Sequence, residues 1–241
     1  MTLASLVAGF VDAIAGGGGV VTFPVFLYFG LPVPVIAATN KLAGTCGVVV
    51  SALTYHRDGR VDGRVVKVAW PFVAVGSALG AAALSQVPND FLKPIVSVLI
   101  LLVAGYCFFR PEMGIRGDFH GLTPGTRALL VGCGLGIGFY DGFFGPGTGV
   151  FLAFLMIQGL GMDFLGATAS TKVLNFVTNL AALALFATRG HIRFDIGVPM
   201  AVANVAGAYL GAKLAIVKGS GFVRWVYVVM AAAVAVRLTL G

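Results

Sequence analysis

The chain has 241 residues, of which 59% are hydrophobic and 10% are charged, whereas about 25% of the residues in a soluble domain are charged. This composition excludes a soluble globular protein and predicts an all-α polytopic membrane protein with about eight short spans. The formal net charge of +7 does not indicate nucleic-acid binding, because the basic residues lie mostly in short loops between apolar runs, as in other membrane proteins.

Apolar runs follow one another along the whole chain. They cover residues 3–31, 33–55, 67–86, 91–109, 128–160, 164–188, 195–217 and 222–240. A polar linker, 111–127, separates an N-terminal transmembrane repeat, 1–110, from a C-terminal one, 128–241. The first Lys or Arg is Lys41, so no basic segment precedes the first apolar run and we expect no cleaved signal peptide.

The two halves resemble each other at a nearly constant spacing. Lys41 and Lys172 are 172 − 41 = 131 residues apart. The same spacing relates Gly76 to Gly207, Gly80 to Gly211 and Phe91 to Phe222. Internal duplication is the usual origin of transporter folds. We therefore predict two homologous repeats of four segments each.

Each half opens with an apolar run that is interrupted by glycines. The first interruption is Gly16 to Gly19, and the second is G-P-G-T-G from Gly145 to Gly149. A glycine costs about 1 kcal/mol in a helix interior and a proline costs more, so we predict that the helix breaks at both places. At membrane depth, a break is tolerated only where the backbone is buried in protein or lines a cavity.

Two topologies fit the first broken segment. Residues 3–31 as one helix would be roughly 44 Å long, which exceeds a hydrocarbon core of about 30 Å. A re-entrant hairpin that enters and leaves on one side would solve this problem and would make the repeats inverted. If the segment crosses instead, the repeats are parallel. The basic loops after the second apolar run of each half, with Arg57, Arg60 and Arg64 in one and Arg189 and Arg193 in the other, favour parallel repeats. The length of the run favours the hairpin, so the topology stays open.

Lys41 and Lys172 each lie about eight residues into an apolar run, roughly 12 Å deep. A lysine at a helix centre costs about 2.5–3.5 kcal/mol, so it faces a partner or a cavity. One interpretation is a structural ion pair of Lys41 with Asp12 or Asp141. Because two lysines follow glycine breaks at matching positions, we favour a substrate path.

The predicted site combines these lysines with the new helix starts near Val20 and Val150. Such starts carry unpaired N–H groups and about half a positive charge, so the site would be a positive cavity for a small anion. The predicted substrate-binding residues are Lys41, Lys172, Asn40, Thr171, Gly17, Gly18, Gly19, Gly147, Thr148, Gly149 and Asn175.

Other polar residues have predicted roles around this cavity. Asp12 and Asp141 either balance the lysine charges or carry a proton, and both interpretations stay open. Thr22 could donate a hydroxyl hydrogen bond. Asn179, Asn204 and Gln158 are interpreted as contacts between helices.

Four motifs together resemble a known family. They are F-V-D-A-I-A-G-G-G-G-V-V-T-F-P, A-A-T-N-K-L, G-F-Y-D-G-F-F-G-P-G-T-G and A-T-A-S-T-K-V-L-N-F. These motifs are similar to those of the sulfite exporter TauE/SafE family, also called the toluene sulfonate uptake permease family, and the resemblance covers nearly the whole chain. It implies a multi-pass permease of the bacterial inner membrane with anionic sulfur-containing substrates such as sulfite, sulfonates or sulfoacetate.

The N-terminus departs from the family pattern. Few residues precede Asp12, where the family usually has a longer apolar lead-in. We expect either a start further upstream or an unusually short first half-helix.

The sequence leaves two other functions open, an anion channel and an intramembrane aspartyl protease. The protease fits less well, because no G-x-G-D motif is present and paired lysines have no role in that chemistry. Metal transport would need clusters of His, Cys or carboxylates within the membrane. We therefore expect no metal, no cofactor and no nucleic acid. The expected partners are the anion and the lipid bilayer, with proton coupling and a homodimer as open expectations.

Overall fold

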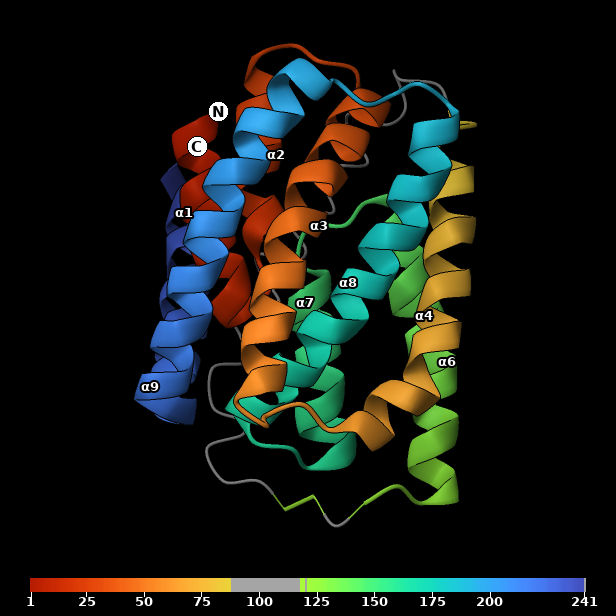
Figure 1. Cartoon of the computed structure of the whole chain (residues 1–241), viewed down its shortest axis with the longest axis vertical. Helices are drawn as coiled ribbons and strands as arrows, with labels where there is room; N and C mark the ends of the chain where they lie inside the picture. Colours follow the sequence, from red (N-terminus) through yellow and green to blue (C-terminus); the bar gives the residue numbers. More distant parts are fainter. Residues whose placement is uncertain (88–117, 120, 241) are drawn as a thin grey trace.

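The computed structural model describes residues 1–87, 118–119 and 121–240 (Figure 1). The regular elements in these ranges are all helical. They are α1 (Thr2–Ala15), α2 (Gly18–Tyr28), α3 (Val33–Arg57), α4 (Gly63–Leu84), α6 (Pro124–Phe143), α7 (Thr148–Phe154), the π-helical turn η1 (Leu155–Gly159), α8 (Phe164–Thr188) and α9 (Phe194–Leu240). The predicted run 91–109 and most of the predicted linker 111–127 lie outside the described residues.

Local signals explain several helix ends. Asp163 caps α8, because its carboxylate accepts a hydrogen bond from the N–H of Gly166. Helix α6 begins inside the predicted linker, since Thr123 and Thr126 form a reciprocal capping box. The segment α9 covers the last two predicted runs as two helices that meet at Gly219, where φ is 74° and ψ is −172°, outside the helical range.

Four of the described helices are long and apolar enough to cross a membrane: Val33–Arg57, Gly63–Leu84, Phe164–Thr188 and Phe194–Val226. Large apolar side chains on α4 and α9 point outward, with exposed fractions of 55% for Leu79, 69% for Val202 and 63% for Trp225. Apolar exposure on this scale suits lipid rather than water. The chain is therefore an all-α polytopic membrane protein, as its composition predicts.

Helices α1 and α2 form a re-entrant hairpin (Figure 1). Helix α1 runs inward from the N-terminus, and α2 folds back so that its end lies near the start of α3. The contacts agree with this path, because Met1 packs on the same apolar cluster as Leu27 and Leu31, which follow the break. The first broken segment thus enters and leaves at one end of the molecule, as the length of the run favours.

A second hairpin enters from the opposite end (Figure 1). Helix α6 leads to the break, and α7 with η1 returns to the end from which α6 started. Asp118, before α6, donates its N–H to the carbonyl oxygen of Gly161, after η1, over 2.7 Å. The two hairpins therefore have opposite directions, as an inverted repeat would require, and the repeat itself stays a prediction.

Close helix contacts occur at positions that the predicted repeat relates. A Cβ on Gly76 of α4 would collide with the backbone of Leu135 and Phe139 in α6. A Cβ on Gly207 of α9 would collide with Leu6 and Phe10 in α1. Only glycine allows these backbones to approach so closely. Each hairpin is thus held by a long helix from the other half of the chain.

Candidate substrate-binding site

The first helix break lies where the glycines predict it. Helix α1 ends at Ala15, and Gly16 adopts a left-handed conformation with φ 76°, while its N–H donates to the carbonyl oxygen of Asp12 over 2.8 Å. Helix α2 then begins at Gly18. A left-handed residue at a helix end is most easily a glycine. The first predicted break is confirmed.

The second break is longer and also follows the prediction. Helix α6 ends at Phe143, and both Gly145 and Gly147 have positive φ, 93° and 84°. Helix α7 starts at Thr148, whose hydroxyl donates to the carbonyl oxygen of Gly145 over 2.7 Å. The Tyr140 hydroxyl donates to the carbonyl oxygen of Pro146 over 2.7 Å. These hydrogen bonds satisfy carbonyl groups of the irregular backbone, for which the lipid core offers no hydrogen-bond partners.

The two breaks pack directly against each other. A Cβ on Gly16 would lie 2.5 Å from the Cα atom of Gly149, and a Cβ on Gly19 would lie 2.9 Å from the Cα atom of Pro146. Real side chains essentially never come so close to backbone atoms. The glycines therefore let the two hairpin tips meet in the interior of the protein.

Two ion pairs cross between the halves of the chain beside these tips. The Lys41 ammonium in α3 donates to Asp141 Oδ2 in α6 over 2.6 Å. The Lys172 ammonium in α8 donates to Asp12 Oδ2 in α1 over 3.0 Å, and also to the Asp12 carbonyl oxygen. The formal charges of the four side chains sum to +2 − 2 = 0. The ion-pair alternative is therefore present in the geometry, with Asp141 as the partner of Lys41.

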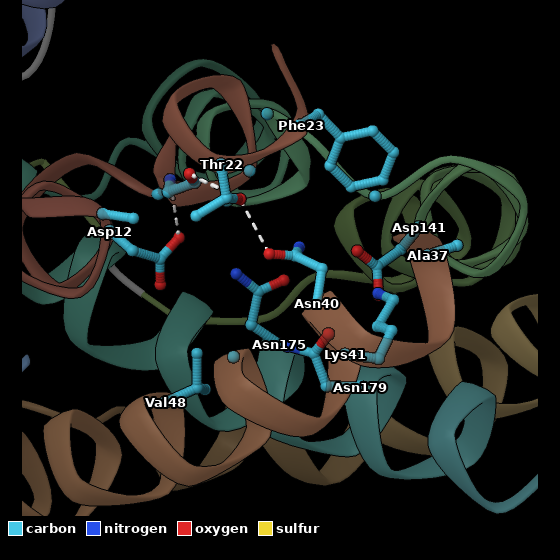
Figure 2. Close-up of a pocket in the computed structure, with 18 of the residues that line it drawn as sticks. Asp12, Thr22, Phe23, Ala37, Asn40, Lys41, Val48, Asp141, Asn175 and Asn179 are labelled. Atoms are coloured by element: carbon cyan, nitrogen blue, oxygen red, sulfur yellow. Dashed lines mark hydrogen bonds and ion pairs between the residues drawn. The ribbon is translucent and has the colours of Figure 1, made fainter. Parts of the chain in front are cut away.

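A cavity of about 50 Å³ lies between these groups (Figure 2). Its charged lining residues are Lys41, Asp12 and Asp141. The glycines of both breaks contribute backbone to its wall: Gly16, Gly18, Gly19, Gly145, Gly147 and Gly149. Since a water molecule needs roughly 10–15 Å³ by this kind of measure, the cavity holds a few waters or a small anion.

Most of the predicted site residues meet at this cavity. Those that line it are Asn40, Lys41, Gly18, Gly19, Gly147, Gly149 and Asn175, together with Asp12 and Asp141. Four others lie outside its wall. Lys172 is fully buried behind Asp12, Thr171 donates its hydroxyl to Met156 Sδ, Thr148 is bonded to Gly145, and Gly17 precedes α2.

Two asparagines and one glycine that the sequence does not predict as site residues also line this wall. The sequence predicts Asn179 and Asn204 as contacts between helices, but both line the cavity, as does Gly44 of α3. The interpretation of Asn204 is correct in part, because its amide donates to the Ser5 carbonyl oxygen over 3.1 Å. Asn179 lies four residues after Asn175, hence one turn further on the same helix face. This spacing of four residues is the sequence pattern that places Asn179 on the same face as Asn175.

The amides around the cavity are only partly satisfied. Thr22 donates its hydroxyl to Asn40 Oδ1 over 2.7 Å, and the Asn40 NH2 group has no partner among the described residues. Asn175 is only 4% exposed, yet its Oδ1 atom has no hydrogen-bond partner in the part of the chain that the structure describes. Figure 2 shows both amides in the space between Asp12 and Asp141. Because an unpaired buried polar atom costs about 1–3 kcal/mol, this arrangement is typical of a binding site.

Broken helices that meet around a charged and polar interior cavity are typical of membrane transporters, and this fold and site place the chain in that class. The family model described as sulfite exporter TauE/SafE matches residues 1–238. The chain belongs to this family, as its motifs predict.

Individual relatives agree with this assignment. The chain is 39% identical over 98% of its length to a probable membrane transporter protein, ORF9, of Sinorhizobium sp, and covers 90% of that protein. It is 38% identical over 93% of its length to a probable membrane transporter protein of Haemophilus influenzae, with 87% of that protein covered. It is 34% identical over 97% of its length to the probable membrane transporter protein YfcA of Escherichia coli K12, with 86% covered. No solved structure matches the chain.

Proposed function

We propose that this membrane transporter moves a small anion, sulfite or an organosulfonate, across the bacterial inner membrane through the cavity between the hairpin tips. The observation that carries the proposal is the place of Lys41. Its side chain is only 6% exposed, yet it lines the cavity and lies beside the second glycine break. A buried ammonium at a polar cavity in a membrane protein is a functional site by default.

Donors on several sides of the cavity suit an anion. Lys41 supplies a charged N–H group, and Asn40 supplies an amide NH2 group. Helix α2 begins at the cavity wall with Gly18, where the positive end of the helix dipole lies. Charge-assisted hydrogen bonds are roughly twice as strong as neutral ones. An oxyanion of a few heavy atoms could accept bonds from Lys41 and Asn40, and the dipole at the start of α2 favours its negative charge.

The substrate class rests on the family. The matching family model is described as a sulfite exporter, and sulfite and sulfonates share a compact oxyanion head. A head of this kind fits a cavity of about 50 Å³ that is lined by donors and glycine backbone. We carry the class to this chain for these reasons and leave the direction of transport open.

The aspartates give this transporter a means of coupling to protons. In this structure each lysine already has a carboxylate partner. An entering anion must displace a carboxylate from its lysine. A proton that neutralises this carboxylate would weaken its bond to the lysine, so the anion would no longer compete with a charged group. We therefore include proton coupling through Asp12 or Asp141 in the proposal.

A binding screen tests the proposed function. Purified protein is heated with sulfite, sulfate, thiosulfate, methanesulfonate or acetate, because a bound ligand raises the unfolding temperature by mass action. We expect stabilisation by sulfite or a sulfonate in the wild type and in the control Lys67→Met, since Lys67 is exposed on α4. Lys41→Met keeps the bulk of the side chain and should lose the effect. Equal stabilisation of Lys41→Met would contradict the proposal.

An anion channel remains the second candidate function, because a channel would need a similar polar path. The ion pairs and the packed hairpin tips beside the cavity favour a carrier, because they would block a continuous open pore. A protease is disfavoured, because an aspartyl dyad shares a proton between two carboxylates, whereas Asp12 and Asp141 each bind a lysine. Counterflow separates the first two, as only a carrier exchanges labelled for unlabelled substrate against a gradient.

A further inference from the structure

The two ion pairs have the same chemistry but different surroundings. Lys172 is fully buried, lies outside the cavity wall and donates to two oxygens of Asp12, the carbonyl oxygen and Oδ2. The other carboxylate oxygen of Asp12 accepts from the N–H of Gly18 over 3.2 Å. Both carboxylate oxygens are thus engaged, one with the lysine and one with the start of α2. Breaking this pair would also release the hairpin tip.

The pair of Lys41 and Asp141 is more open. Both side chains line the cavity, and a single hydrogen bond of 2.6 Å joins them. The Lys41 Nζ atom lies 3.4 Å from the point where a Cβ on Gly145 would be. Because Gly145 has no side chain, a ligand can approach the ammonium beside the second break. If a ligand oxygen takes the place of Asp141 as the partner of Lys41, both hairpin tips can stay in place.

Charge neutrality limits what this pair can exchange. The four central side chains sum to zero, so a single bound anion without a proton would leave a net charge of −1 inside the protein, which is costly. The charged side chains that line the cavity with Asp141 are Lys41 of α3 and Asp12 of α1, and Lys172 of α8 lies behind Asp12. Helices α2 and α7 carry no charged residue, and α4 carries only Arg64 and Lys67, in its first two turns. No further charged group of these helices can offset the anion.

We propose that Lys41 and Asp141 form the exchanging pair, whereas Lys172 and Asp12 form a fixed pair that holds the first hairpin tip. In the exchange, a proton binds the Asp141 carboxylate and the hydrogen bond from Lys41 to that carboxylate breaks. The Lys41 ammonium keeps its protons and donates to an oxygen of the anion instead. One proton therefore enters with one negative charge, which makes binding electroneutral. This inference rests on the proposed anion transport and assigns its coupling to one aspartate.

The test measures the affinity of methanesulfonate by calorimetry at several pH values between about pH 5 and pH 9, where this probe keeps one negative charge. Sulfite is measured beside it as the proposed substrate. Linkage predicts that the wild-type affinity falls by up to about tenfold per pH unit as pH rises, because binding takes up one proton. Asp141→Asn leaves Lys41 without a competing carboxylate, so its affinity should be high and independent of pH. The double variant Asp12→Asn with Lys172→Gln removes the fixed pair without changing the summed charge of the centre, so it should keep the wild-type slope while lowering the unfolding temperature.

If this double variant does not fold, Asp141→Asn still decides, because the inference predicts that this substitution alone abolishes the pH dependence. The inference is overturned if Asp141→Asn retains the pH dependence, or if removal of the fixed pair abolishes it. If neither methanesulfonate nor sulfite binds the wild type at any pH, the proposed function fails and this inference fails with it. The two failures are therefore distinguishable.

Discussion

Asn175 presents a polar amide to the cavity without a complete set of partners. Its Oδ1 atom is buried and unpaired, and its Nδ2 atom lies 3.1 Å from the point where a Cβ on Gly149 would be. Proteins usually satisfy such groups, because each unpaired atom costs about 1–3 kcal/mol. A functional reason therefore explains the residue better than a packing reason.

Replacing Asn175 by leucine should separate binding from stability. Asn175→Leu removes the unpaired acceptor Oδ1, so we expect an unchanged or slightly higher unfolding temperature. It also removes the Nδ2 group, which can donate to an anion, so we expect the anion affinity to fall by about tenfold or more, the worth of a hydrogen bond to a charged group. Calorimetry with sulfite and a thermal melt measure the two effects.

Asn204→Leu is the matched control for this substitution. It removes an amide that donates to Ser5, so it should lower the unfolding temperature. If Asn175→Leu destabilises the protein as much as Asn204→Leu does, Asn175 is a structural residue and its role at the cavity is disproved.

Sequence reasoning found the charged residues but treated the two lysines as equivalent. Lys41 and Lys172 occupy matching positions and both follow a glycine break, so nothing in the local pattern separates them. The structure separates them, since Lys41 lines the cavity and Lys172 is enclosed behind Asp12. That difference depends on how the partner carboxylate from the other half packs, which no local pattern contains.

At the scale of helices, the ends of the elements follow local chemistry. The breaks at Gly16 and Gly145 to Gly147 are predictable because glycine and proline destabilise helix interiors. The direction of the chain after a break is not predictable in this way. The apolar run around α2 is equally compatible with crossing and with folding back, and its contacts with α1 decide between them.

The residue that caps α4 allows a direct test of the claim that local hydrogen bonds set the helix ends. Asp62 accepts hydrogen bonds from the N–H groups of Arg64 and Val65. Asp62→Ala should lower the free energy of unfolding by about 1 kcal/mol. Asp58→Ala is the control, because Asp58 forms only an exposed pair with Arg60 and such pairs contribute little. Equal effects of both substitutions would contradict the capping role.

The stabilisation of α4 by the Asp62 cap should also depend on pH. The hydrogen bond from the Arg64 side chain holds the pKa of the Asp62 carboxyl below its usual value, despite partial burial that acts in the opposite direction. The folded pKa is lower than the unfolded pKa of about 3.9. The stabilisation is therefore complete above the unfolded pKa and is lost as pH falls through the folded pKa. Acid melts of the wild type and Asp62→Ala should converge at low pH.

At the scale of the whole molecule, two hairpins of opposite direction meet tip to tip, and lysines from long helices of one half bind aspartates of the other half (Figure 1). The composition predicts the membrane class, and the 131-residue spacing predicts which residues correspond. Neither predicts the crossed pairing, because sequence spacing does not say which half supplies the partner of each lysine.

Labelling from the two sides of the membrane tests the hairpin. In a chain whose native cysteines are replaced, Phe29→Cys and an N-terminal tag should be accessible from the same side, since α1 and α2 enter and leave together. Arg60→Cys, after the spanning helix α3, should react from the opposite side. If Phe29→Cys and the N-terminal tag lie on opposite sides, the first broken segment crosses the membrane and the hairpin is wrong.

The central claim is that the cavity between the hairpin tips is the path of the anion, and Gly44 offers the most direct test of it. Gly44 lines the cavity from α3, and a Cβ there would meet no atom within 4 Å. Gly44→Leu therefore fills the cavity without disturbing the packing around it. Gly132→Leu is the matched control, because Gly132 is also helical and unobstructed but lies on the exposed face of α6.

The measurement is counterflow of labelled sulfite into vesicles that contain each purified variant. Both substitutions replace a helical glycine and should keep or raise the unfolding temperature, since a glycine costs about 1 kcal/mol in a helix interior. We predict wild-type counterflow for Gly132→Leu and loss of counterflow for Gly44→Leu. Wild-type counterflow by a folded Gly44→Leu protein would show that the anion takes another path and would contradict the claim.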